Sequence, residues 1–133
     1  MLRVVDLRAT PAAIAEARAF VREASWGLSD QDRMDLLLAA GEATTNAVRH
    51  GSPRGERCRI LLICRRTEEW LTLTIHDSGV PFEPPTSLPS PDEPGGRGVH
   101  VMRCCVDEVA FGRWEMGNVV TLRKRLGDGA TGK

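Results

Sequence analysis

The sequence lacks an excess of charge of either sign. Its 133 residues carry 18 basic and 18 acidic side chains, so the formal net charge is zero. Binding to nucleic acid or to an anionic membrane usually requires a basic surplus. The one short basic run, RKR at 123–125, is typical of a solvated strand end. We therefore expect no direct contact with nucleic acid and none with a membrane.

Long apolar runs are missing too. No segment approaches the roughly 18 apolar residues of a transmembrane helix, and the start, MLRVVDLRAT, lacks the apolar stretch of a signal peptide. Hydrophobic residues make up 41% of the chain and charged residues 27%, as in ordinary globular proteins. We expect a cytoplasmic protein with a single domain over residues 1–126 and a disordered tail over residues 127–133.

The cysteines and histidines do not form a recognisable metal motif. The cysteines are Cys58, Cys64, Cys104 and Cys105. None of them has the C-x-x-C spacing of zinc or redox sites, and the three histidines are spread through the chain. We interpret the cysteines as buried, reduced thiols.

Apolar periodicity and turn residues predict the order strand, helix, helix, strand, strand, loop, helix and hairpin. The expected strands cover residues 2–7, 57–65 and 70–77; the expected helices cover 10–26, 32–50 and the residues after 98; the hairpin covers 107–126. Thr10 is the expected N-cap of the first helix, with Pro11 as its first residue. Ser29 is the expected N-cap of the second helix, and Gly51 ends it. This order favours an α+β two-layer sandwich, with a mixed, mostly antiparallel sheet and the helices on one face.

The stretch GEATTNAVRHG, residues 41–51, places Glu42, Asn46 and His50 at four-residue intervals on a helix. Each is offset by about 40° from the one before, so all three share one face. A solvated face more often carries Lys, Arg and Glu, and a core face carries Leu and Val. Glu and Asn among residues as small as Ala43 leave room for a polar ligand. For His50, a favourable position near the helix C-terminus is an equally good explanation.

Two further stretches have unusual polar features. Asp77 continues the apolar face of a strand beyond Ile75, although a strand-ending turn alone would explain it. Residues 81–94 hold six of the eight prolines, which excludes a helix or a central strand. GGRG at 95–98 then opens a helix, and free amides at a helix start can bind an anion. Together these features predict a nucleotide pocket with a flexible lid over residues 81–97.

The three stretches resemble the motifs of the Bergerat-fold (GHKL) ATP-binding domains. EATTNAVRHG resembles the N box, DSGVPF the first glycine box, and GGRGVHVMRCCVDEV the second glycine box with its helix. Their order and spacing fit over residues 3–126. Within this superfamily, the chain is similar to the small anti-sigma-factor serine kinases of the RsbW and SpoIIAB type.

The resemblance implies a role for each matching residue. Glu42 would be the general base, Asn46 would ligate the Mg²⁺ that bridges the ATP phosphates, and Asp77 would accept the adenine amino group. The other implied cofactor-binding residues are Gly79, Gly96, Arg97, Gly98 and Asn118. Whether Arg97 contacts phosphate or only solvent is open. Asn118 stands where the superfamily often has a Thr that binds adenine through water.

Two functions are compatible with this resemblance. The first is an ATP-dependent serine/threonine protein kinase that phosphorylates a STAS-type anti-anti-sigma protein and sequesters a sigma factor. The second is a non-catalytic, ATP-sensing anti-sigma factor or adaptor. Glu42 favours the first, because a pure binding module needs no base there. The family also implies a homodimer.

Overall fold

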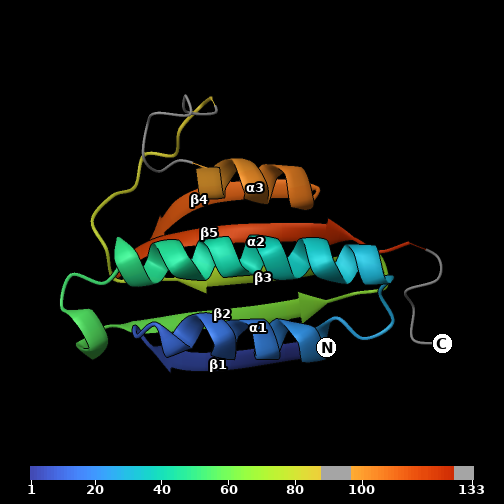
Figure 1. The fold of residues 1–133 in the computed structure, drawn as a ribbon, viewed down its shortest axis with the longest axis horizontal. Helices are drawn as coiled ribbons and strands as arrows, with labels where there is room; N and C mark the ends of the chain where they lie inside the picture. Colours follow the sequence, from blue (N-terminus) through green and yellow to red (C-terminus); the bar gives the residue numbers. More distant parts are fainter. Residues whose placement is uncertain (88–96, 128–133) are drawn as a thin grey trace.

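The computed structural model describes residues 1–87 and 97–127. Within them the chain forms one five-stranded sheet with three α-helices on one face (Figure 1). The elements are β1 (Leu2–Arg8), α1 (Ala12–Ala24), α2 (Asp30–Arg49), the 3₁₀ turn η1 (Gly55–Arg57), β2 (Arg59–Arg66), β3 (Trp70–His76), α3 (Arg97–Cys105), β4 (Glu108–Trp114) and β5 (Gly117–Arg125). The predicted order of elements and the two-layer α+β architecture are confirmed. The predicted tail lies outside the described residues, except for Gly127.

The sheet has the strand order β1-β2-β3-β5-β4. All four pairings between the described strands are antiparallel, so the sheet is not mixed. The register aligns Leu62 of β2 with Ile75 of β3, and Ile75 with Val120 of β5. Because β5 lies beside β3, the residue that follows β3 lies next to the start of β5. That placement builds one end of the site described below.

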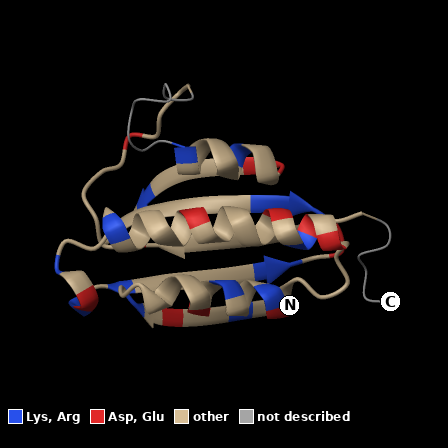
Figure 2. Ribbon diagram, viewed as in Figure 1, with Lys and Arg blue, Asp and Glu red and all other residues tan. Residues whose placement is uncertain are grey.

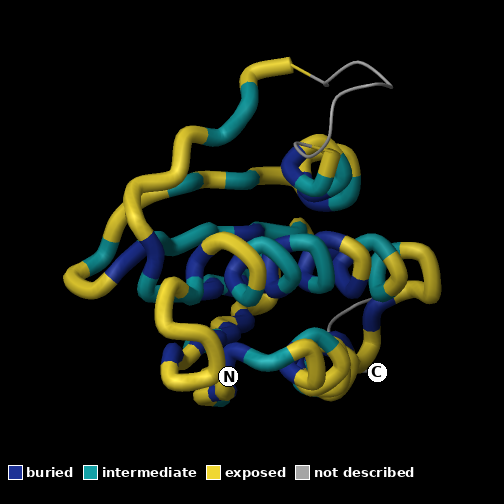
Figure 3. The backbone as a smooth tube through the Cα atoms, turned by 60° about the vertical axis from the view of Figure 1, so that its left-hand side comes forward, coloured by how far each residue is buried: buried dark blue, intermediate teal, exposed yellow. Residues whose placement is uncertain are grey.

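The core lies between the sheet and the helices, where Figure 3 shows the buried segments. Alternate residues of the strands point into it, as the sequence pattern predicts. The fully buried large side chains include Leu36, Ile60, Leu62, Leu71, Leu73 and Leu122. Helices α1 and α2 contribute small side chains such as Ala17 and Ala40, both fully buried. Such small residues let the helices lie close to their neighbours.

The helix starts lie within two residues of the predicted ones. Ser29 caps α2, because its hydroxyl accepts a hydrogen bond from the Asp32 N–H at 3.1 Å. Helix α1 begins at Ala12, one residue later than predicted, and Pro11 is its cap residue with φ −55° and ψ −30°. Thr10 contributes its backbone carbonyl, which accepts from the Ala13 N–H at 2.9 Å.

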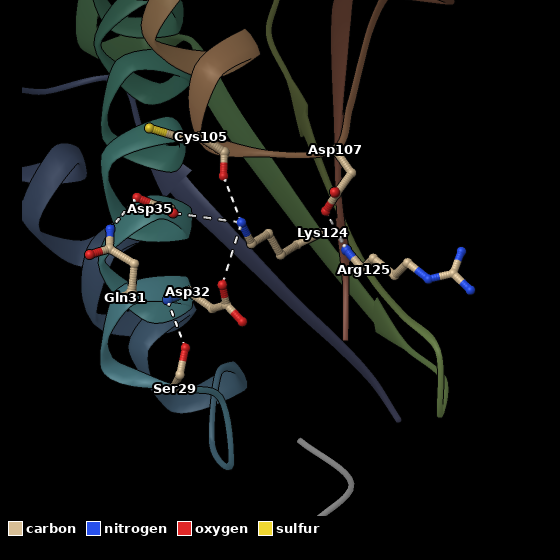
Figure 4. Close-up of polar contacts among 8 residues, drawn as sticks. All are labelled: Ser29, Gln31, Asp32, Asp35, Cys105, Asp107, Lys124 and Arg125. Carbon is tan, nitrogen blue, oxygen red and sulfur yellow. Dashed lines mark hydrogen bonds and ion pairs between the residues drawn. The ribbon is translucent and has the colours of Figure 1, made fainter. Parts of the chain in front are cut away.

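Lys124 of β5 joins two helices to the sheet (Figure 4). Its ammonium lies 3.7 Å from a carboxylate oxygen of Asp32 and 3.7 Å from one of Asp35, both on α2. It also donates a hydrogen bond to the Cys105 carbonyl, at the end of α3, at 3.0 Å. The Lys124 side chain is only 12% exposed, so solvent screens these contacts weakly. They fix the position of α3 relative to α2.

Several charged residues form local ion pairs between neighbouring elements. Figure 2 shows basic residues at the ends of β2 and β5 and acidic residues along α2. In the run at 123–125, Arg123 pairs with Glu108 at 2.8 Å, and Lys124 pairs with carboxylates of α2. None of the helices within the described residues is both long and apolar enough to span a membrane.

The cysteines occupy different environments. Cys58 and Cys64 are buried, as predicted, and Cys105 is half-buried. Cys104 is exposed, so the prediction of buried thiols is wrong for this residue. Helix α3 turns Val99 and Met102 into the core, and Cys104 falls on the opposite, solvent-facing side.

Candidate functional site

A cavity of about 140 Å³ opens between the C-terminal half of α2 and the ends of β3, β4 and β5. Its walls are largely apolar and include Ile75, Met102, Phe111, Val119 and Val120. Its polar groups come from Asn46, His50, Asp77 and Asn118. The structure therefore brings together residues that lie more than 70 positions apart in the sequence, as 46 and 118 do.

Asp77 extends the pairing of β3 with β5, because its backbone N–H donates to the Asn118 carbonyl at 2.9 Å. Its carboxylate oxygen Oδ1 accepts from the Gly79 N–H at 2.9 Å, the Asn118 N–H at 3.0 Å and the Asn118 side-chain amide at 3.3 Å. Among the described residues, no group donates a hydrogen bond to the second oxygen, Oδ2. The protein thus holds the carboxylate by one oxygen, whereas Oδ2, which lies beside Gly51, accepts no hydrogen bond from these residues.

Three glycines allow the chain to pack tightly around Asp77. A Cβ at position 51 would overlap the Asp77 carboxylate, and one at position 117 would overlap the Asp77 backbone carbonyl. A Cβ at position 79 would lie 2.8 Å from the Cα of Gly51. Gly51 therefore ends α2 as predicted, but its role is to admit a neighbour. It does not adopt the left-handed conformation common at helix ends.

Asn118 uses the whole hydrogen-bonding capacity of its side-chain amide within the protein. Its Nδ2 donates to the Val80 carbonyl at 2.7 Å and to Asp77 Oδ1. Its Oδ1 accepts from the Phe82 N–H at 3.1 Å and from the Arg113 guanidinium at 3.2 Å. Asn118 thus lines the cavity but acts on the loop after β3. A direct bond to a ligand would require one of these contacts to break.

Glu42 and Asn46 share one face of α2, as predicted, but have different surroundings. Asn46 lines the cavity, whereas Glu42 is not among its lining residues. Glu42 lies one turn before Asn46 in α2, beside the first turn of α3. A Cβ at position 98 would come within 2.8 Å of Glu42 Oε2, so the glycine admits this carboxylate. Arg97, the first residue of α3, is exposed, and Gly96 lies outside the described residues.

The start of the proline-rich loop is tied to the rest of the molecule. The centroids of the Phe82 and Phe111 rings lie 5.6 Å apart. Arg103 of α3 donates a hydrogen bond to the Pro85 carbonyl at 2.7 Å. Together with the Asn118 contacts to Val80 and Phe82, these interactions anchor residues 80–85. Most of the predicted lid, residues 88–96, lies outside the described part of the chain.

Sequence reasoning did not identify two residues of β4 that contact the loop after β3. Arg113 donates to the Gly79 carbonyl at 2.8 Å, and the Trp114 indole donates to the Asp77 carbonyl at 2.8 Å. The predicted hairpin contained a signal for both. A turn at 115–116 pairs Arg113 with Asn118 and Trp114 with Gly117, next to the end of β3.

The hydrogen-bond acceptors and apolar walls of the cavity suit the base of a purine nucleotide. A free carboxylate oxygen beside apolar walls can accept from an exocyclic amino group while the ring is buried. No cluster of three or more His, Cys, Asp or Glu side chains in the described residues could hold a metal by itself. The single amide oxygen of Asn46 instead fits an ion such as Mg²⁺, whose other ligands are phosphate oxygens and water.

Comparison with known proteins gives a family and a fold. A family model described as the histidine kinase-like ATPase domain matches residues 7–124. No curated protein sequence matches the chain. One similar solved structure is that of the RsbU and RsbW domains of Rv1364c from Mycobacterium tuberculosis, with a TM-score of 0.71 and 23% identity over 95% of this chain and 32% of that one.

A second similar structure is the histidine kinase domain of the blue-light activated histidine kinase from Erythrobacter litoralis EL346. Its TM-score is 0.59, with 20% identity over 90% of this chain and 62% of that one. The chain therefore spans about a third of the first solved chain and less than two thirds of the second. At these identities, both likenesses concern the fold.

Proposed function

The chain belongs to the histidine kinase-like ATPase domain family, and on this premise we propose that it binds ATP with Mg²⁺ and transfers the terminal phosphoryl group to a protein serine or threonine. The observation that carries the proposal is the Asp77 carboxylate. One of its oxygens is fixed by three hydrogen bonds, and the other is left for a ligand at a largely apolar cavity.

Each site residue has a distinct role in this proposal. Asp77 Oδ2 accepts from the adenine amino group, and Ile75 and Met102 contact the buried ring. Asn46 would hold the Mg²⁺, and the ion would supply positive charge to neutralise the phosphates. Glu42, one turn along α2, accepts the proton of the attacking hydroxyl group. The close approach of the Glu42 carboxylate to Gly98 supports this role, because Glu42 then lies beside a helix start whose amides can bind an anion.

The proposed partners are a STAS-type anti-anti-sigma protein, as substrate, and a sigma factor, which the chain sequesters as a homodimer. The fold shared with a structure that contains an RsbW domain supports this choice. One observation favours the non-catalytic alternative. Glu42 lies outside the cavity and against the first turn of α3. In that case the chain senses ATP and binds its partner without phosphorylating it.

Titration calorimetry with Mg²⁺-ATP and Mg²⁺-ADP tests the binding site. Asp77→Asn replaces the free acceptor and removes a charge-assisted hydrogen bond worth ~1.5–3 kcal/mol, so we expect the affinity to fall by about 10–100-fold. Asp6→Asn is the matched control, because Asp6 pairs with Arg59 on the exposed part of β1 and should not affect binding. A wild-type protein that binds neither nucleotide would remove the proposal.

Incubation with labelled ATP and candidate STAS proteins separates the two functions. Label transferred to serine or threonine supports the kinase. A wild-type protein that binds a sigma factor with ATP present, yet labels no STAS protein, would establish the non-catalytic alternative.

A further inference from the structure

The loop that carries Asp77 is held by two consecutive residues of β4. Consecutive residues of a strand point to opposite faces of the sheet. The Arg113 guanidinium reaches the Gly79 carbonyl on the cavity side. The Trp114 indole reaches the Asp77 carbonyl on the other side, where its ring also packs edge-on against His76 with 5.1 Å between ring centroids. The backbone on either side of Ser78 is therefore fixed from both faces.

Arg113 also acts on the Asp77 carboxylate through Asn118. The same Arg113 nitrogen that binds the Gly79 carbonyl lies 3.2 Å from Asn118 Oδ1. Together with the Phe82 N–H, which donates to the same oxygen, this contact holds the amide in the orientation that directs Asn118 Nδ2 toward Asp77 Oδ1. The contacts therefore run from Arg113 through Asn118 to Asp77 Oδ1. Holding Oδ1 in this way sets the orientation of the second oxygen, Oδ2.

We propose that Arg113 is a positioning residue for base recognition, which orients the Asp77 carboxylate before the nucleotide arrives. This inference rests on the proposed nucleotide-binding function. A carboxylate that is already oriented loses little conformational freedom when the ligand binds. The entropy cost of binding is therefore smaller, and the ligand binds more tightly. The benefit depends on the group that Asp77 recognises, so it is specific to a base with an exocyclic amino group.

A purely structural role for Arg113 predicts a different pattern. Arg113 is exposed, so water can replace its bonds to the Gly79 carbonyl and to Asn118 at little cost to folding. Its loss should therefore change ligand discrimination more than stability. The two roles separate when binding is measured with and without the amino group on the base.

The test compares ADP with purine riboside diphosphate, which lacks the 6-amino group, by titration calorimetry with Mg²⁺. We expect Arg113→Met to weaken ADP binding by ~3–10-fold, the worth of one ordinary hydrogen bond, and to leave the analogue nearly unchanged. Arg113→Lys keeps a cationic donor and should restore part of the preference for ADP. Arg65→Met is the control, because Arg65 is exposed on β2, whose neighbours are β1 and β3.

A double mutant tests whether Arg113 acts through Asp77. If it does, Arg113→Met should weaken ADP binding much less in the Asp77→Asn background than in the wild type. Thermal unfolding verifies that each variant folds, and faster exchange of the Gly79 amide in ligand-free Arg113→Met would support the loosened loop.

The outcomes are distinguishable. Equal losses for ADP and the analogue, additive losses in the double mutant, or no loss at all would overturn the role of Arg113 while leaving the nucleotide site intact. A wild-type protein that binds ADP but does not prefer it to the analogue would also overturn it. If the wild type binds neither ligand, the proposed function itself fails.

Discussion

Glu42 and Asn46 are one helical turn apart on α2, but the structure gives them different neighbours. Asn46 faces the cavity with Asp77, and Glu42 meets the backbone of α3 at Gly98. A nucleotide bound in the cavity would therefore lie closer to Asn46 than to Glu42. The two side chains can therefore be separated by mutation, although they share one helix face.

We expect Asn46→Ala to weaken Mg²⁺-ATP binding, because it removes the only amide proposed as a metal ligand. Glu42→Ala should leave nucleotide affinity nearly unchanged and lower phosphate transfer by ~10²–10⁴-fold, the usual effect of losing a general base. Both variants can be measured in one buffer, by calorimetry and by transfer of labelled phosphate. Transfer at the wild-type rate by Glu42→Ala would show that Glu42 is not the base.

Some of the site residues could be found from the sequence and others could not. Asp77 could be recognised because a carboxylate on the apolar face of a strand is unusual, and a ligand or a turn must compensate for its burial. The role of Asn118 could not be recognised from the sequence. Its amide bonds to the backbone of Val80 and Phe82, which lie in a loop without a periodic pattern. Arg113 was missed because an arginine near a hairpin turn is normally solvated.

Among the elements, α2 contains a glycine within it and another just beyond its end. Gly41 lies inside the helix, and the nearest atom to a Cβ built there is the Arg18 Cδ, at 4.0 Å. Gly51 lies past the cap residue His50, and a Cβ there overlaps the Asp77 carboxylate. The same substitution should therefore have opposite effects at the two positions.

Gly41→Ala should stabilise the protein by ~0.5–1 kcal/mol, because alanine loses less conformational freedom in a helix and has room here. Gly51→Ala should destabilise it by ~1–3 kcal/mol, the usual range for overpacking, and should also displace Asp77 and weaken nucleotide binding. Urea unfolding measures both effects, and calorimetry measures the second. Equal stability of Gly51→Ala and the wild type would mean that Asp77 moves aside without cost.

The elements were more predictable than the contacts between them. Alternating apolar residues in β2 and β3, and the apolar stripe of α1, follow directly from the periods of strand and helix. The start of α1 differed by one residue, because the proline imposes a helical φ whether it caps the helix or begins it. The attachment of residues 80–85 depends on side chains of α3, β4 and β5, which no local pattern encodes.

For the whole molecule, stability in alkali should depend on a buried thiol. Burial raises the pKa of Cys64 to about 11 from an ordinary value of 9.0, despite the opposing attraction of Arg66 and Arg3. The unfolded chain loses this proton from about pH 9, and the folded chain keeps it until about pH 11. The contribution is therefore fully present below pH 9 and is lost as the pH rises toward 11.

We expect Cys64 to account for a loss on the order of 2 kcal/mol in the free energy of unfolding between pH 9 and pH 11. The chain contains no tyrosine, so phenol groups, which also titrate in this range, make no contribution. Urea unfolding at several pH values should show a shallower decline for Cys64→Ala and an unchanged one for the exposed Cys104→Ala. The same decline in both variants and the wild type would contradict this role.

The strand order also has a consequence for biosynthesis. A ribosome releases the N-terminal part of a chain first. Strands β1 to β3 and the first two helices, with Asn46 and Asp77, would emerge before the hairpin of β4 and β5 that inserts β5 beside β3. Until that hairpin emerges, the cavity lacks Phe111, Val120 and the contacts of Arg113, Trp114 and Asn118. We therefore expect a nascent or C-terminally shortened chain that lacks this hairpin to have an incomplete cavity and to lose the proposed nucleotide binding.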